Sequence, residues 1–204
     1  MFVEDLDNQE KFRKILEIPY SDLIQFVFEY LKKKTSLIMF FVFACIASLT
    51  IAVSIRIDIS GYYRSMEIFM HSILGLIVFP VLIIPVHELL HIIPYYMLGA
   101  KNIRIGMDLK QYLFYVTAHR HVASSSQFKI VAVVPFLIIS LISLFLIFYM
   151  PGLWKWSISL FLFVHTTMCA GDFALLNFYS LNSDKKIYTW DDADEKVAYF
   201  YEEL

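Results

Sequence analysis

The chain has 204 residues, of which 59% are hydrophobic and only 18% are charged, and its formal net charge is −2. Soluble domains are about half apolar and about a quarter charged, so the composition argues against an ordinary soluble domain. The near-neutral charge argues against nucleic acid as a partner, and the two cysteines, Cys45 and Cys169, fit no disulfide framework or thiolate zinc site. We therefore expect an integral membrane protein with the lipid bilayer as its solvent.

The N-terminal part, residues 1–35, is polar and helix-prone and does not resemble a signal peptide. Residues 36–55 form the first long apolar run, and about 20 such residues cross a bilayer. The second run, residues 66–98, is too long for one straight perpendicular span, since a helix rises about 1.5 Å per residue. Kinks or breaks are expected within it, because it contains prolines at positions 80, 85 and 94.

Two further apolar runs follow, at residues 130–150 and 153–181, and the pair Pro151-Gly152 predicts a tight turn between them. The sequence thus predicts about four transmembrane helices. The polar connection from Lys101 to Gln127 is long, and it contains two strand-like stretches that predict a β-hairpin: the alternating residues Ile103, Ile105 and Met107, and the run from Tyr112 to Thr117. In the polar tail, Tyr188 and Trp190 suggest a short strand.

Positive charges concentrate in the N-terminal segment, in the loop after the second span and in the tail. Because cytoplasmic loops carry an excess of Lys and Arg, we expect these regions, and both termini, on the cytoplasmic side of the cell membrane. The predicted fold class is an all-α multi-pass membrane protein with a small cytoplasmic β-hairpin-like loop. It divides into a cytoplasmic N-terminal segment (1–35), a four-span membrane domain (36–181) and a cytoplasmic tail (182–204).

The segment His87-Glu88-Leu89-Leu90-His91 carries the clearest chemical signal. Two histidines four residues apart on a helix face the same way, so their imidazoles can share one tetrahedral zinc ion. Glu88 lies beside them, where it can take a proton from an attacking water. Ionisable groups in an apolar span cost about 2.5–3.5 kcal/mol each on insertion scales, which favours a functional explanation over packing.

Asp172 is our candidate for the third zinc ligand, because it is the acidic residue of the fourth span and falls at a depth similar to that of His87. His119 and His121 in the polar loop are rival candidates. His165 lies seven residues before Asp172 on the same helical face, where it would support a ligand or stabilise an oxyanion. More often such a histidine merely bonds a neighbouring backbone or hydroxyl group, and this is the interpretation that we favour.

These residues resemble the bacterial putative zincin peptidase family, which is similar in plan to site-2-protease-type membrane metalloproteases. The resemblance rests on the run from Pro85 to His91, on Gly99-Ala100-Lys101 with Gly106, on Val134-Pro135-Phe136 and on Gly171-Asp172. It implies zinc bound by His87, His91 and Asp172, with Glu88 as the catalytic base. The chain departs from the pattern at Pro94, which closely follows the second histidine, and at His165, where relatives tend to have asparagine.

Together these observations predict a zinc metalloendopeptidase of the HExxH type that hydrolyses a membrane or membrane-proximal protein substrate. The alternative is a non-catalytic zinc-binding membrane protein with a structural or regulatory role, in which a protein ligand such as His165 closes the fourth zinc position. A small transporter subunit with a polar relay is a third interpretation.

Overall fold

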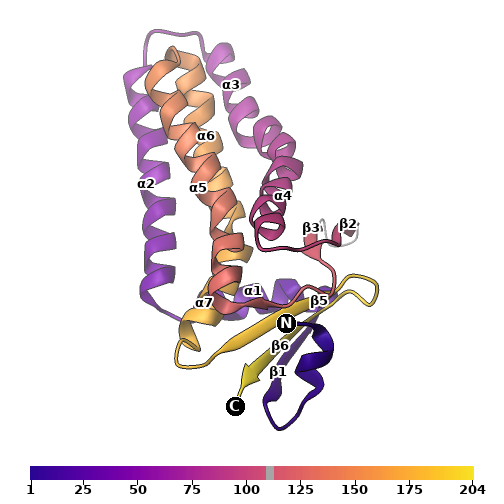
Figure 1. Cartoon of the computed structure of the whole chain (residues 1–204). Helices are drawn as coiled ribbons and strands as arrows, with labels where there is room; N and C mark the ends of the chain where they lie inside the picture. The colour runs from indigo at the N-terminus through magenta and orange to yellow at the C-terminus, as the bar shows by residue number, and fades with distance from the viewer. Residues whose placement is uncertain (109–112) are drawn as a thin grey trace.

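The computed structural model describes residues 1–108 and 113–204. It is mostly helical, with long helices above and two small antiparallel sheets at one end (Figure 1). The long elements are α2 (Ser36–Asp58), α3 (Ser65–Ile73), the π-helical turn η3 (Leu74–Val78), α4 (Phe79–Met97), α5 (Ser125–Tyr149), α6 (Gly152–Met168) and α7 (Ala170–Leu181).

Three helical runs are long and apolar enough to cross a membrane: Ser36–Asp58, Ser65–Met97 and Ser125–Tyr149. The bent pair α6 and α7 passes the same test as one broken span, which brings the count to as many as four. The four predicted apolar segments are therefore confirmed as helices, and the composition of these helices is that of a membrane protein.

The second run, for which we expected kinks or breaks, is one continuous helical run from Ser65 to Met97. It continues through α3, η3 and α4, and the π-helical turn η3 precedes Pro80, whose ring cannot supply a backbone N–H. Its upper part is tied to α6, because His71 Nδ1 lies 2.8 Å from Ser157 Oγ and Trp156 donates its Nε1–H to Ser72 Oγ over 2.9 Å. Below this anchor, α4 separates from α6 and packs mainly against α5 as it approaches the sheets (Figure 1).

The fourth predicted span is bent by 42° between α6 and α7. Two threonine hydroxyls just before the bend donate to backbone carbonyls of the preceding turn, Thr166 to Leu162 and Thr167 to Val164, each over 2.7 Å. Such back-bonding is a known cause of helix bending. The bend places Asp172 in the first turn of α7.

The prediction of an all-α protein was wrong in one respect, because a four-stranded sheet joins the two ends of the chain. Its order is β1-β6-β5-β4, formed by β1 (Phe12–Pro19), β6 (Val197–Glu203), β5 (Ile187–Asp192) and β4 (Ala123–Ser124). The N-terminal segment was expected to be helix-prone, yet β1 pairs along its length with β6. This long-range pairing overrides the local propensity. The strand suggested by Tyr188 and Trp190 is confirmed as β5.

The predicted hairpin is confirmed as β2 (Ile103–Asp108) and β3 (Leu113–Ala118), which pair antiparallel in a separate sheet. Tyr112, which we assigned to the second strand, lies outside the described residues. Both chain termini lie at the same end of the molecule as this hairpin (Figure 1). Four membrane crossings require both termini and the loop after the second span to lie on the same side of the membrane. Which side this is stays a prediction.

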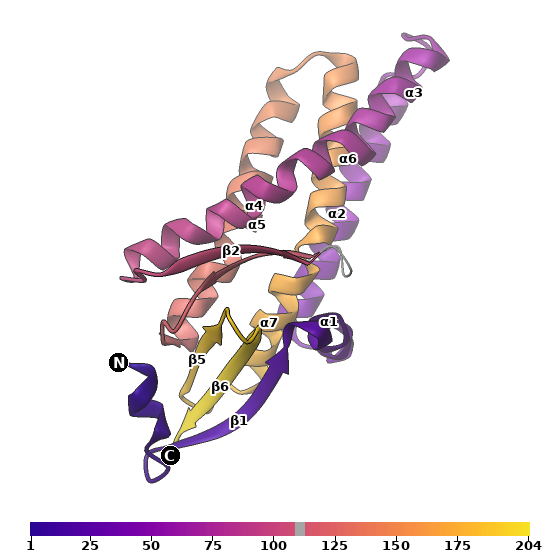
Figure 2. The same ribbon diagram turned by 90° about the vertical axis from the view of Figure 1, so that its right-hand side faces the viewer.

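Below the helices, α1 (Leu23–Lys32) runs across the base of the bundle against α7 (Figure 2). It follows the short 3₁₀ helices η1 (Val3–Asp7) and η2 (Tyr20–Asp22). The fully buried Asn177 of α7 donates to the carbonyl oxygens of Tyr30 and Lys33 at 2.7 and 2.9 Å. These bonds fix α1 against α7.

Candidate metal centre

The two histidines of the HExxH segment lie on successive turns of α4 and point to the interior. Each is only 8% exposed, and their ring centroids are 5.2 Å apart. This is the arrangement that the i, i+4 spacing predicted.

Asp172 of α7 meets both histidines, with one oxygen for each ring. Its Oδ2 lies 3.3 Å from His87 Nε2, and its Oδ1 lies 3.6 Å from His91 Nε2. With bonds of about 2.0–2.2 Å, two ligand atoms of one tetrahedral zinc ion are about 3.3–3.6 Å apart. The structure thus brings together the three residues that the sequence selected, at distances that suit a shared metal ion.

The other ring nitrogen of each histidine is occupied. His91 Nδ1 lies 2.9 Å from the carbonyl oxygen of Val131, and His87 Nδ1 lies 3.2 Å from His165 Nε2. A carbonyl oxygen can only accept, so His91 must carry its proton on Nδ1. In the neutral ring, Nε2 then presents a lone pair to the Asp172 carboxylate. Two acceptors face each other there, and a cation between them would make the contact favourable.

Glu88 lies between the two histidines and the hairpin. Its carboxylate has an oxygen within 4.8 Å of ligand atoms of both His87 and His91, and it lies beside the backbone of Val116 in β3. The hairpin therefore approaches the HExxH segment from the side on which Glu88 lies.

His165 belongs to the same neighbourhood. It is fully buried, and its ring forms a second group of candidate ligands with His87 and Cys169, all within 4.8 Å. His165 Nδ1 has no hydrogen-bond partner among the residues that the structure describes. The contact with His87 Nδ1 agrees with the expectation that His165 supports a ligand, whereas Cys169 was not selected from the sequence. Cys169 follows His165 by four residues, which puts both side chains on the same face of a helix. This spacing was the signal in the sequence that could have identified Cys169.

The rival candidates from the polar loop lie elsewhere. His119 sits by the turn between β5 and β6, 3.6 Å from Asp194, and its Nδ1 accepts the backbone N–H of Ala193 over 3.0 Å. If Nδ1 accepts, the neutral ring carries its proton on Nε2 and has no lone pair left for a metal. His121 belongs to none of the candidate metal groups found among the described residues.

A cavity of about 260 Å³ opens beside the metal ligands. Apart from α4, its walls come from α1, β3, α5, α6 and α7, and they are mostly apolar. The contribution of α1, through Leu23, Phe26 and Val27, was not predicted. The sequence does show that these three residues fall on one apolar face of an amphipathic helix. It does not show which part of the protein that face contacts.

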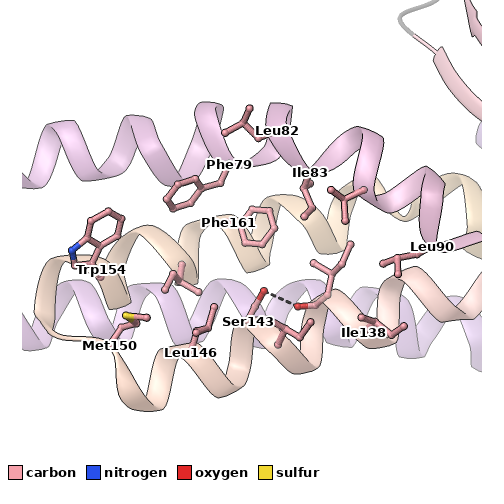
Figure 3. Close-up of a pocket in the computed structure, with 14 residues that line it drawn as sticks. Phe79, Leu82, Ile83, Leu90, Ile138, Ser143, Leu146, Met150, Trp154 and Phe161 are labelled. Atoms are coloured by element: carbon pink, nitrogen blue, oxygen red, sulfur yellow. Dashed lines mark hydrogen bonds between the residues drawn. The ribbon is translucent and has the colours of Figure 1, made fainter.

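A larger apolar cavity of about 550 Å³ lies farther up, between α4 and the pair α5 and α6 (Figure 3). Leu90, which directly precedes His91 in sequence, lines one end of it, and Trp154 and Met150 line the other end (Figure 3). Val86, which directly precedes His87, also belongs to its wall. Ser143 is the polar side chain in its wall, and its hydroxyl already donates to the carbonyl of Ile139 over 2.7 Å. The cavity therefore offers apolar contacts next to the candidate metal centre.

Comparison with known proteins gives one match. A family model described as putative zincin peptidase matches residues 80–187, more than half of the chain. The matched region contains His87, Glu88, His91, His165 and Asp172. No curated protein and no solved structure matches the chain.

Proposed function

Because the chain belongs to the putative zincin peptidase family, we propose that it is a membrane-embedded zinc endopeptidase. In this proposal His87, His91 and Asp172 hold the zinc ion, and Glu88 is the general base. The remaining position on the metal is left for water and substrate, as in catalytic zinc sites with three protein ligands.

The observation that carries the proposal is the contact between His91 Nε2 and Asp172 Oδ1 at 3.6 Å. Val131 fixes the proton of His91 on Nδ1, so the two facing atoms are both acceptors. A buried pair of this kind is unfavourable on its own. A zinc ion between the two atoms would turn the unfavourable contact into a pair of metal–ligand bonds.

A zinc ion held by these residues would supply Lewis acidity, which would lower the pKa of water to about 7 and polarise a peptide carbonyl. The protein's residues do the rest. Glu88 takes a proton from the attacking water and passes it to the departing amine. Val131 and His165 hold the two imidazoles in the orientation that directs Nε2 to the metal.

The walls of the site support an extended peptide with apolar side chains as the substrate. The backbone of Val116 lies beside Glu88, so the edge of β3 that faces α4 is available for main-chain pairing with a substrate strand. The apolar cavity above the site would accommodate an apolar part of the same substrate. We therefore propose a membrane or membrane-proximal protein substrate, cleaved near the cytoplasmic face.

A non-catalytic metal protein is the second candidate, and the group of His87, His165 and Cys169 favours it. A metal bound by Nδ1 of His87 and by His165 and Cys169 would be enclosed by buried residues and would leave Glu88 without a role. Such a closed set of ligands is typical of structural zinc sites.

Metal analysis of purified variants separates the two candidates. The proposal predicts about one zinc per chain in the wild type, its loss in Asp172→Ala, and its retention in Cys169→Ser. Asp184→Ala is the matched control, because Asp184 is an exposed aspartate shortly after α7. Zinc that survives Asp172→Ala but disappears in Cys169→Ser would assign the metal to the enclosed group and contradict the proposal.

A further inference from the structure

A smaller cavity lies on the side of the four-stranded sheet, next to the cavity of about 260 Å³ beside the candidate metal ligands, which we call the metal pocket. The smaller cavity has a volume of about 130 Å³. The polar groups in its lining come from four separate elements, η2, α4, β3 and β5, and belong to Tyr20, Tyr95, Tyr115, Thr117, Thr189 and Asp191. We call this cavity the Asp191 chamber.

One hydroxyl group in its wall has no protein partner. Thr117 is 3% exposed, and its Oγ1 makes no hydrogen bond to any residue that the structure describes. A buried hydroxyl in that state is costly unless a water molecule bonds to it. The chamber has room, since one water needs only about 10–15 Å³ of such volume and two to four polar partners.

The carboxyl group of Asp191 is a second polar group in the chamber that would be stabilised by water. It forms no ion pair with any described residue, and the groups beside it are the hydroxyls of Thr117 and Tyr20. Burial raises the pKa of Asp191 to about 6, so the group still carries its charge at neutral pH. A buried carboxylate without a cationic partner needs several hydrogen-bond donors, and the two hydroxyls of Thr117 and Tyr20 leave acceptor sites on it that a water molecule would fill.

The chamber adjoins the metal pocket directly. The two cavities share six lining residues, Leu23, Tyr95, Tyr115, Val116, Phe128 and Leu175. Tyr95 follows His91 by one helical turn and lines both cavities. The apolar cavity on the other side of α4 offers water no comparable partners.

We propose that the Asp191 chamber holds water and is the store from which the metal pocket draws the molecule that each hydrolysis consumes. The second half of this proposal rests on the proposed peptidase function. The first half does not, because hydration of the chamber is a property of the folded protein.

Hydration is tested by X-ray radiolytic footprinting of the full-length protein in detergent, which oxidises buried side chains that lie beside bound water. Tyr20 and Tyr95 should be labelled in the wild type although they are 7% and 5% exposed. Phe173, which is 1% exposed in the helical core, serves as the internal reference and should stay unlabelled. Labelling of the two tyrosines should fall several-fold in Thr117→Val and in Asp191→Leu, but not in the control Asp194→Asn.

Thr117→Val also has a thermal readout that does not depend on activity. In a dry chamber the variant removes an unpaired hydroxyl and should raise the Tm, whereas in a hydrated chamber it removes a water ligand and should lower the Tm or leave it unchanged. Tyrosines labelled no more than Phe173, together with a raised Tm, would overturn the proposal. A Tm that rises with sodium or potassium in the wild type but not in Asp191→Asn would identify a bound cation instead of water and would also overturn it.

Supply of water to the metal pocket is tested by peptide cleavage. Asp191→Leu and Thr117→Val should lower kcat several-fold with KM and zinc content unchanged, since neither residue contacts the candidate metal ligands. An unchanged kcat in variants whose labelling has fallen would refute the supply role. Failure of the peptidase proposal itself would look different, because the wild type would then show a labelled chamber and no cleavage.

Discussion

His91 donates its Nδ1–H to the backbone carbonyl of Val131 over 2.9 Å. This bond connects α4 to α5 and fixes the tautomer of one candidate zinc ligand without using a side chain that a mutation could remove. His87 is held differently, because its Nδ1 faces the Nε2 of another histidine, His165, at 3.2 Å. The two ligand candidates therefore differ in how they respond to substitution of their neighbours.

Loss of the partner of His87 should weaken zinc binding. His165→Leu removes the acceptor for His87 Nδ1, and removal of such a supporting group typically costs about 10–100-fold in metal affinity. His165→Asn, which restores an acceptor, should recover part of the loss. Competition with a chromogenic chelator measures the affinity, and His71→Leu, at the opposite end of the helices, is the control. Equal zinc affinities in the wild type and His165→Leu would contradict the assigned role.

A proline on the edge of β3 should block cleavage but not zinc binding. The backbone of Val116 faces Glu88, and alternate residues of a strand direct their N–H groups to the same edge. Phe114→Pro therefore removes an N–H that would pair with substrate. Met107→Pro is the matched control, because Met107 is paired with Phe114 but belongs to β2. If both variants cleave a peptide substrate equally well, β3 is not the surface that binds it.

Both termini are predicted to face the cytoplasm. The positive charges of the N-terminal segment, of the loop after the second span and of the tail favour that side. A reporter fused after Leu204 should read as cytoplasmic, and one inserted at Gly61, in the turn between α2 and α3, should read as external. The opposite pattern would place the metal centre near the outer face and would refute the proposed site of cleavage.

The stability of the protein should gain from neutralising Asp191, and the gain should depend on pH. The pKa of Asp191 is raised from 3.8 to about 6 in the folded protein, so the folded state binds the proton more tightly than the unfolded state. Its contribution to stability thus declines as the pH rises from about 4 to about 6 and is constant above that. Two pKa units correspond to at most about 3 kcal/mol.

Asp191→Asn should accordingly raise the Tm little at pH 4 and most at pH 7 or above. Asp194→Asn, whose carboxylate is 67% exposed, should show no such trend. Thermal unfolding followed by intrinsic fluorescence between pH 4 and pH 8 provides the comparison. A gain for Asp191→Asn that is the same across this range would show that the carboxyl group is not desolvated.

Much of the helical layer and of the candidate site could be predicted from the sequence, because both depend on local patterns. Apolar runs of sufficient length identify spans, and the spacing of His87 and His91 fixes their common face. Asp172 could be selected because a charge in an apolar span is costly and the depths of two spans can be counted.

The four-stranded sheet and the groups that surround the candidate ligands could not be predicted, because they depend on contacts between distant parts of the chain. β1 forms through pairing with β6, almost the whole length of the sequence away. The roles of Val131 and Tyr95 depend on how α4 lies against its neighbours, and a backbone carbonyl that orients an imidazole leaves no signature in the sequence.

The most direct test of the proposed peptidase is the Glu88→Gln variant. This change keeps the size of the side chain and its ability to form hydrogen bonds, but it removes the base, and proton transfer of this kind is typically worth about 10²–10⁴ in rate. We predict that Glu88→Gln retains about one zinc per chain and wild-type Tm, while cleavage of a membrane substrate falls by at least two orders of magnitude. Wild-type cleavage by a zinc-loaded Glu88→Gln protein would contradict the account and leave a metal site without the proposed catalytic base.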